Sequence, residues 1–231
     1  MPATLSVIIP TLNAGEELPE TANALLSGVG DGLIRELIVT DGGSSDDTLE
    51  IARELGAVIV EGTAGRGQQL WRGVQASQCD WLLLLHADSW LDKGWVTQAL
   101  DHMNIHPDKA GWFRLRFRAT GLGPFILAAG ANMRSMLLGL PYGDQGLLIS
   151  RALLDEIGGI PQIPLMEDVA LARSLKGKLR SLDCAIYTSA RRYEQGGWIR
   201  QPLRNLMTLV RYLLGTSPET LATRYHKKHT D

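Results

Sequence analysis

Residues 36–48 read ELIVTDGGSSDDT, an apolar run that passes directly into an acidic, glycine-rich loop beginning at Asp41. The run predicts a β-strand over residues 36–40. Its side chains are nearly all apolar rather than alternating, which is typical of a strand buried on both faces in a parallel sheet. Open parallel sheets bind ligands beyond the carboxyl ends of their strands, so the loop after this strand is a candidate ligand site.

Three further segments resemble residues 36–40 in character. The strands that they predict are residues 5–10 (LSVIIP), 57–60 (AVIV) and 81–85 (WLLLL). Between the strands, apolar residues recur at helical spacing over residues 16–26, 47–55 and 68–77. The repeated alternation of strand and helix predicts an α/β fold, a doubly wound and mostly parallel sheet with helices on both faces.

The second half of the chain is less regular. Residues 111–118 alternate between polar and apolar side chains and predict a half-exposed, antiparallel strand. Residues 119–133 carry no charge, but these fifteen residues are too few to cross a bilayer, which needs about twenty. Another short strand is predicted over residues 147–149, and helices over residues 93–105 and 167–176.

Length and composition fit one globular domain. The chain has 231 residues, of which 45% are hydrophobic and 21% charged. Cys79 and Cys184 form neither a disulfide framework nor a zinc site, so we expect two buried thiols in a reducing compartment. The N-terminus lacks a basic and then apolar signal, which predicts a cytoplasmic protein. The formal net charge of −2 argues against nucleic acid as a partner.

The C-terminal part forms an extension that is expected to be helical. We divide the chain into a domain of residues 1–197 and an amphipathic helical extension of residues 198–231. Within the extension, residues 201–214 place their apolar side chains on one helical face and two arginines on the other. That apolar face either packs on the core or on a second subunit, giving a homodimer, or rests on an anionic membrane at the inner face and presents a lipid acceptor.

The loops after the first three strands offer groups for a nucleotide. Asp41 ends a buried strand, where a carboxylate can accept hydrogen bonds from a pyrimidine ring N–H. Arg66 precedes a helix, and a guanidinium beside a helix N-terminus suits a diphosphate. Each loop also has a structural interpretation: residues 41–48 would be a turn that caps the next helix, and residues 62–67 a plain connection.

Asp88 follows the apolar run of residues 81–85, near the middle of the predicted sheet. A single carboxylate there can bind Mg²⁺ or Mn²⁺ and leave other ligand positions for phosphate oxygens and water. The structural alternative is a cap for the helix of residues 93–105. His86 is expected to pack or to face phosphate, since these hard ions prefer oxygen.

Further charged and polar groups follow in the second half. Acidic residues at 167 and 168 would either offset the dipole of a helix N-terminus or, in the case of Asp168, act as a general base. We assign the acceptor or diphosphate side of the site to five residues: Asp144, Gln145, Glu167, Arg191 and Arg192. Arginines are common on surfaces, so Arg191 and Arg192 also have that simpler interpretation.

In order along the chain, these motifs resemble the family 2 glycosyltransferases of GT-A fold, over roughly residues 5–195. The forms Leu85-His86-Ala87-Asp88, Gly143-Asp144-Gln145 and Met166-Glu167-Asp168 resemble a bacterial subgroup often labelled as arsenosugar or hopanoid-linked transferases. The resemblance implies that Pro10, Thr11 and Asp41 hold the nucleoside with Arg66 nearby, that Asp88 is the metal end of an Asp-x-Asp motif, and that Asp168 is the catalytic base. His86 replaces the first aspartate of that motif, and Trp71 stands where the family usually has asparagine.

The function that follows is an inverting transfer of a sugar from a nucleoside-diphosphate sugar, with UDP favoured, to the hydroxyl of an unknown lipid or small-molecule acceptor. A sugar nucleotidyltransferase is one alternative, although it would show a longer glycine-rich loop with a basic residue after the first strand. A non-catalytic nucleotide-binding module is the other, and it would need neither Asp168 nor the polar cluster at residues 143–145.

Overall fold

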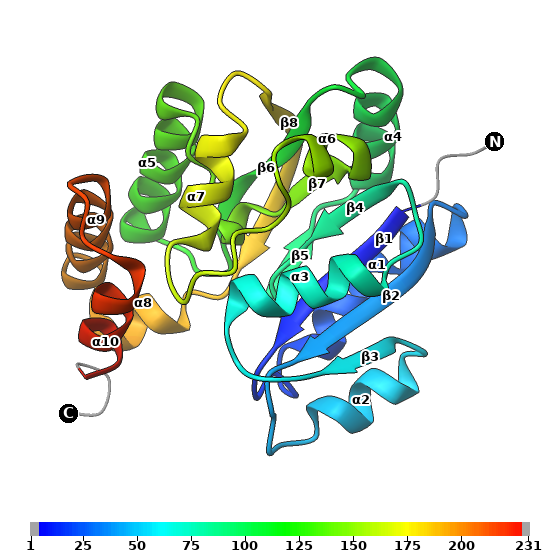
Figure 1. Cartoon of the computed structure of the whole chain (residues 1–231), viewed down its shortest axis with the longest axis horizontal. Helices are drawn as coiled ribbons and strands as arrows, with labels where there is room; N and C mark the ends of the chain where they lie inside the picture. Colours follow the sequence, from blue (N-terminus) through cyan, green and yellow to red (C-terminus); the bar gives the residue numbers. More distant parts are fainter. Residues whose placement is uncertain (1–4, 228–231) are drawn as a thin grey trace.

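The computed structural model describes residues 5–227, apart from the side chains of Arg192, Gln195 and residues 224–227. Its centre is an eight-stranded sheet of order β3-β2-β1-β4-β7-β6-β8-β5 (Figure 1). The strands are β1 (Leu5–Thr11), β2 (Ile34–Asp41), β3 (Val58–Glu61), β4 (Trp81–Leu84), β5 (Ser89–Leu91), β6 (Ala110–Phe117), β7 (Leu147–Ser150) and β8 (Leu179–Thr188).

Helices connect and cover the strands. They are α1 (Leu18–Gly30), α2 (Thr48–Glu54), α3 (Arg66–Ala76), α4 (Trp95–Ile105), α5 (Leu122–Leu138), α6 (Arg151–Glu156), α7 (Glu167–Ser174), α8 (Arg191–Gly196), α9 (Arg200–Leu213) and α10 (Pro218–Lys227), with a 3₁₀ turn at Gly143–Gln145.

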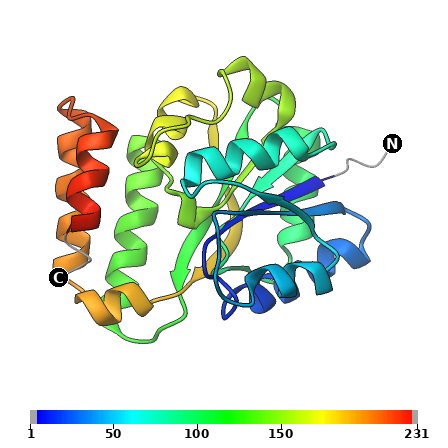
Figure 2. The ribbon, with the colours of Figure 1, turned by 60° about the horizontal axis from the view of Figure 1, so that its bottom comes forward.

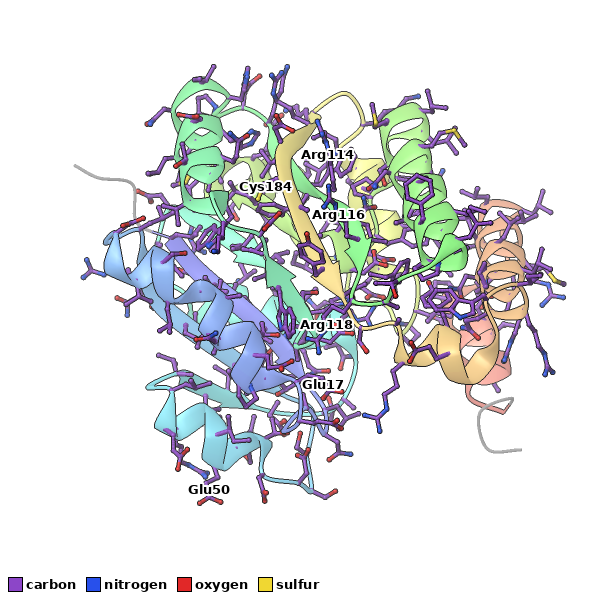
Figure 3. All side chains as sticks on the ribbon, turned by 180° about the vertical axis from the view of Figure 1, so that it is seen from behind. Glu17, Glu50, Arg114, Arg116, Arg118 and Cys184 are labelled. Atoms are coloured by element: carbon purple, nitrogen blue, oxygen red, sulfur yellow. The ribbon has the colours of Figure 1, made fainter. Side chains whose placement is uncertain are left out.

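The sheet is buried on both faces, as the continuous apolar runs predict. On one face, Val7 and Ile9 of β1 join a core with α1, α2 and α4. On the other, Ile8 joins a second core with α3, α6 and α7. Figure 1 shows α3, α6 and α7 in front of the sheet, and Figure 3 shows α1 and α4 from behind. The doubly wound α/β prediction is therefore confirmed.

The parallel half of the sheet agrees closely with the predicted elements. Strand β1 pairs in parallel with β2 and β4, and β2 pairs in parallel with β3. Each of the four predicted strands is present within two residues of its predicted ends. Because these strands run in the same direction, the loops that follow them meet at one edge of the sheet.

The strand predicted over residues 111–118 is present, but the predicted antiparallel orientation was wrong for most of its length. Strand β6 runs antiparallel to β7 only at Gly111 and Leu148, and along most of its length it pairs in parallel with β8. Its first four residues are buried, and only from Arg114 onward do exposed and buried side chains alternate. Figure 3 shows Arg114 and Arg116 on this strand, seen from behind the sheet.

Most of the uncharged segment, residues 122–133, belongs to α5, which was not predicted as a helix. Pro124, Ala128 and Ser135 of α5 are buried, while most of its large apolar side chains are exposed. Across residues 5–227, helices of the length and apolarity that a membrane crossing requires are absent. The two cysteines are free and buried, as expected.

The C-terminal extension consists of α9 and α10, preceded by the short α8, and lies at one end of the molecule beside α5 (Figures 1 and 2). Its apolar face does not pack on the core of this chain. Leu206 and Met207 are 54% and 53% exposed, and Leu214 is 82% exposed. Inward contacts come instead from Leu209, which packs with Val169 and Ala172 of α7. Residues 228–231 of the predicted extension and residues 1–4 of the predicted domain lie outside the described residues.

Candidate functional site

The carboxyl ends of β1 and β2 place Thr11 next to Asp41. Asp41 is 1% exposed, and its carboxylate accepts four hydrogen bonds. The hydroxyls of Thr11 and Ser44 donate to Oδ1 over 3.0 and 2.5 Å. The backbone N–H groups of Gly43 and Ser44 each donate to Oδ2 over 2.7 Å. Pro10 precedes Thr11 on β1, half-buried and paired with Thr40.

These hydrogen bonds decide the charge of Asp41. Burial by itself would raise the pKa of the carboxyl, but the donors from Ser44, Gly43 and Thr11 outweigh burial and hold the pKa below its usual value. Hydrogen bonds to a carboxylate favour its ionised form. Asp41 is therefore a buried anion whose oxygens organise the loop that follows β2.

The same loop is clamped by the residues after β1. Asn13 adopts a left-handed backbone with φ of 51°. Its side-chain oxygen accepts a 2.8 Å hydrogen bond from Ser45 N–H, and its own N–H donates to Ser44 Oγ over 2.8 Å. Asp46 accepts from Thr48 N–H at 3.1 Å and from Gly15 N–H at 3.0 Å. Asp46 therefore binds the start of α2, while the serines bind Asn13 and Asp41.

Gln69 joins three loops and was missed by the sequence analysis. It is 5% exposed, and its Nε2 donates to the carbonyl oxygens of Thr11 over 2.8 Å and Thr40 over 2.7 Å. Its Oε1 accepts from Gly65 N–H over 3.1 Å. The available signal was a polar residue on the same side of α3 as Leu70 and Gly73, which are also buried. Gln69 fixes the strand ends and the first turn of α3 relative to one another.

Arg66, the first residue of α3, lies among four carboxylates. Its Nη1 is 3.4 Å from Glu167 Oε1. Burial alone would lower the pKa of the guanidinium, but Glu167, Asp168, Asp144 and Asp88 outweigh burial and raise it. The predicted residues Arg66, Asp88, Asp144, Glu167 and Asp168 therefore interact electrostatically in one site.

Close backbone packing holds α3 against the segment that leads into α7. A Cβ at Gly67 would lie 2.3 Å from the carbonyl oxygen of Pro161 and 3.3 Å from Cβ of Glu167. Only glycine permits this approach, and the approach fixes the distance between Arg66 and Glu167.

Glu167 and Asp168 open α7, immediately after Met166 with its left-handed φ of 67°. Asp168 Oδ2 accepts a 3.1 Å hydrogen bond from Gly143 N–H, and Oδ1 accepts from Val169 N–H over 2.8 Å. Burial first, and then the charge of Asp168, raise the pKa of the 4%-exposed Glu167 to about 7, against the opposing effect of Arg66. The first turn of α7 thus holds two carboxyls with different environments.

Asp144 lies in the 3₁₀ turn before β7, between Gly143 and Gln145. Burial raises its pKa to about 6; Asp168 and Asp88 act in the same direction, and Arg134 and Arg66 oppose them. Its Oδ1 has no hydrogen-bond partner in the described part of the chain. A buried carboxyl oxygen without a donor is expensive to desolvate, so this atom is available to a ligand.

Asp88 lies after β4, where its Oδ2 accepts a 3.3 Å hydrogen bond from Thr188 Oγ1. His86 is close to the 3₁₀ turn, since a Cβ at Gly143 would lie 2.4 Å from His86 Nε2. Within residues 5–227, three or more His, Cys, Asp or Glu side chains do not converge in a metal-binding arrangement. A Mg²⁺ or Mn²⁺ ion would then take part of its shell from donor phosphates and water, which is usual for these ions. The carboxylate oxygen of Asp88 and the unpartnered oxygen of Asp144 fit such an ion.

Gln145 lies deeper than predicted. It is 0% exposed, and its Oε1 accepts from Ser135 Oγ over 2.6 Å and from Arg134 Nη2 over 3.2 Å. Arg134 in turn places its Cζ 3.4 Å from the centre of the Tyr142 ring. Gln145 therefore ties the 3₁₀ turn to α5 and supports Asp144. Because its side chain is fully buried, it has no exposed surface for the contact with an acceptor substrate that was predicted for it.

Arg191 lies apart from the group around Arg66. Its Nη1 is 2.7 Å from Glu16 Oε2, beside the loop that follows β1, and its side chain is more than half exposed. The side chain of Arg192 lies outside the described residues. The structure therefore places Arg191 beside the loop that follows β1, paired with Glu16.

A small, partly open pocket with a cavity volume of about 40 Å³ lies between β4, the 3₁₀ turn and α7. Its polar lining residues include Arg66, His86, Glu167 and Asp168. Its apolar lining residues include Leu84, Leu171 and Leu175. The predicted base and the predicted diphosphate-binding arginine therefore share one cavity.

The sequence profile of the family described as "Glycosyl transferase family 2" matches residues 6–138. Glucosyl-3-phosphoglycerate synthase of Mycolicibacterium paratuberculosis is 29% identical over 154 residues, which cover 62% of this chain and 40% of that protein. Glycosyltransferase AglJ of Haloferax volcanii is 30% identical over 102 residues, which cover 43% of this chain and 32% of that protein. The chain spans less than half the length of these curated relatives.

Solved structures share the fold. TarS residues 1–349 of S. aureus, in complex with UDP-GlcNAc, has a TM-score of 0.62 at 19% identity, covering 80% of this chain and 58% of that one. Glucosyl-3-phosphoglycerate synthase of Mycobacterium tuberculosis, in complex with Mg²⁺ and UDP, has a TM-score of 0.59 at 21% identity, covering 81% and 70%.

Proposed function

The chain belongs to glycosyl transferase family 2, and from this premise we propose that it transfers a sugar from a uridine-diphosphate sugar to an acceptor hydroxyl with inversion at the anomeric carbon. One observation carries the proposal: Asp168 is held by Gly143 N–H in the same cavity as Arg66, a cation suited to the departing diphosphate.

We assign Asp41 to recognition of the nucleobase of the donor. A carboxylate has about four acceptor positions, and Thr11, Ser44 and Gly43 already occupy those of Asp41. The hydroxyl of Ser44 can rotate away, so that a pyrimidine ring N–H takes its place on Oδ1. The uridine preference is supported by TarS and the mycobacterial synthase, whose structures hold UDP-GlcNAc and UDP.

Asp168 is the proposed general base of the reaction. In this role it accepts the proton of the acceptor hydroxyl while the acceptor oxygen attacks the anomeric carbon from the side opposite the diphosphate. The hydrogen bonds from Gly143 N–H to Oδ2 and from Val169 N–H to Oδ1 together fix the orientation of the carboxylate. Glu167, with its pKa raised to about 7, pairs with Arg66 and sets the position of that arginine before the donor binds.

Arg66 stabilises negative charge that grows on the diphosphate as the sugar leaves. In the structure its charge is balanced by carboxylates, and Glu167 is the nearest at 3.4 Å. A bound diphosphate would compete with Glu167 for the guanidinium. Asp88 and Asp144 would hold a Mg²⁺ or Mn²⁺ ion, which supplies further positive charge at the diphosphate when bound.

A non-catalytic nucleotide-binding module is the second candidate, and the burial of Gln145 bears on it. Gln145 braces the 3₁₀ turn that carries Gly143 and Asp144. Gly143 of this turn then orients Asp168 through its N–H. Such support is expected for a group that must be held in a fixed geometry, and a module that only binds nucleotide does not require it.

Thermal unfolding with UDP-, GDP- and dTDP-sugars, each with and without Mn²⁺, tests the donor. Because ligand binding raises the apparent stability, we expect the largest rise in Tm with UDP-sugars and Mn²⁺ together. Release of UDP in the presence of candidate acceptors then tests transfer. A protein that binds UDP-sugars but never releases UDP faster than the uncatalysed rate would be a binding module.

A further inference from the structure

Helix α5 presents an apolar face that nothing in the described chain covers. Pro124, Ala128 and Ser135 point inward, and the opposite side of the helix is apolar from its first turn to its last. The large apolar side chains of α5 that are more than half exposed are Leu122, Phe125, Ile126, Met133, Met136, Leu137 and Leu138. Exposed apolar surface of this extent usually marks an interaction site.

Helix α9 presents a second apolar face. Gln201 and Leu209 are buried, and Leu209 packs on Val169 of α7. The strongly apolar side of the helix turns away from this contact and toward solvent. The side chains of that face and of the helix end, each 45% exposed or more, are Leu203, Leu206, Met207, Val210, Leu213 and Leu214.

The two helices are neighbours. The segment before α9 places Trp198 over α5, where a Cβ at Gly123 would lie 3.4 Å from the indole ring. Trp198 also stacks on Tyr193 at 5.8 Å between ring centres and contacts Phe117 at 6.0 Å. Figures 1 and 2 both show α5 and α9 side by side at the end of the molecule away from α2. The exposed apolar residues of both helices, named here the α5/α9 surface, therefore lie at the same end of the molecule.

The charges at this region have one sign. At 100° per residue, Arg200, Arg204 and Arg211 of α9 fall in a row along one border of its apolar face. Residues 200–214 contain no Asp or Glu, and neither does α5. Within the described part of the chain, none of the three arginines forms an ion pair. Arginines that border an apolar face are suited to reach lipid phosphates while the apolar side chains enter the acyl region.

We propose that the α5/α9 surface docks on an anionic phospholipid bilayer. An apolar face alone would fit a second copy of this chain equally well. The unpaired arginines favour the bilayer, because a second copy would bring the same positive charge, whereas an anionic membrane brings the opposite one. Leu209 packs with Val169, the residue after Asp168. Docking would therefore hold the proposed acceptor side of the site near the membrane. The inference stands on surface chemistry and does not depend on the proposed glycosyl transfer.

Vesicle sedimentation tests the proposal with the full chain. Binding is measured to phosphatidylcholine vesicles and to vesicles that also contain phosphatidylglycerol. The charge variant R200E/R211E is compared with R35E/R53E, which makes the same charge change at exposed arginines of β2 and α2. The apolar variant L206Q/M207Q changes the other half of the surface. Circular dichroism confirms that each variant is folded, and analytical ultracentrifugation gives its oligomeric state.

We expect the chain to bind anionic vesicles more tightly than neutral ones, and less tightly as salt is raised. Since each arginine near an anionic surface contributes about fivefold in affinity, R200E/R211E should lose at least about tenfold, while R35E/R53E binds like the parent chain. L206Q/M207Q should also weaken binding.

Three results would overturn the proposal: no binding to anionic vesicles, equal losses in R200E/R211E and R35E/R53E, or a dimer that L206Q/M207Q dissociates while vesicles bind neither form. The last result would assign the surface to a second copy. Binding of UDP with Mn²⁺, measured on the same samples, bears only on the proposed function.

Discussion

The Asp144→Asn variant should be more stable than the parent chain above neutral pH. The pKa of Asp144 rises from an ordinary 3.8 in the unfolded chain to about 6 in the folded one, chiefly through burial. Its ionised form is therefore less stable in the fold than in the unfolded chain. Protonated Asp144 therefore contributes to the free energy of unfolding; this contribution is fully present below pH 3.8 and is lost as pH rises through about 6.

The size of the effect follows from the two pKa values. One pKa unit corresponds to about 1.4 kcal/mol, so the difference between 3.8 and about 6 amounts to about 3 kcal/mol at pH 8. At pH 4, where Asp144 is largely protonated in the folded state and partly so in the unfolded state, linkage gives only about 0.5 kcal/mol. Part of Asp144 reaches solvent, which screens its charge, so we expect the D144N variant to gain about 1–3 kcal/mol at pH 8.

Urea denaturation of both proteins, without metal and in a series of buffers from pH 4 to pH 8, measures this gain. Asp155→Asn is the matched control, because Asp155 is exposed on α6 and its substitution removes no buried charge. A gain that does not grow with pH, or a D144N variant less stable than the parent at pH 8, would refute the assignment of Asp144 as a buried, strained carboxylate. The same variant should bind Mn²⁺ and UDP more weakly, since its unpartnered oxygen is a proposed ligand.

Other perturbations address the framework of the site. Gln69→Leu should lower the free energy of unfolding by about 2–4 kcal/mol, because it removes the three hydrogen bonds of a buried side chain. The exposed neighbour Gln68→Leu should change it little in urea denaturation. Gly67→Ala should lower the free energy of unfolding by about 1–3 kcal/mol and weaken UDP binding in calorimetry, because its Cβ meets a backbone oxygen at 2.3 Å. Gly30→Ala, which has open space around it, should leave the stability and the UDP affinity unchanged. Mn²⁺ alone should shift Tm little, and Mn²⁺ with UDP should shift it more than UDP alone; equal shifts with and without UDP would indicate a metal site formed by protein ligands only.

The parallel half of the fold could be predicted because its strands are buried on both faces. Strand β1 contributes Val7 and Ile9 to one core and Ile8 to the other, so the sequence is apolar throughout and the strand is recognisable without its neighbours. Asp41 and Asp88 were found for the same reason, since Asp41 comes directly after such a run and Asp88 three residues after one. Strand β8 was missed because its residues 179–188 mix polar and apolar side chains, and its pairing with β6 depends on contacts distant in the sequence.

The roles of individual side chains depended on packing that sequence alone does not reveal. Gln145 and Gln69 are both polar and near predicted loops, yet each is buried and braces the backbone. The amphipathic pattern of α9 was recognised, but a hydrophobic face has no intrinsic direction. Leu209 packs with Val169 and Ala172 of α7, while Leu206 and Met207 face solvent.

The central claim is that Asp168 removes a proton from the acceptor while the groups around Asp41 and Arg66 hold the donor. The most direct measurement is UDP release from UDP-sugar by Asp168→Asn and by the parent chain, with the Kd for UDP and Mn²⁺ measured on the same preparations. The account predicts a rate at least about 100-fold lower in D168N with a Kd within a few-fold of the parent value, the range expected when a general base is lost. A D168N protein that releases UDP at the parent rate would contradict it.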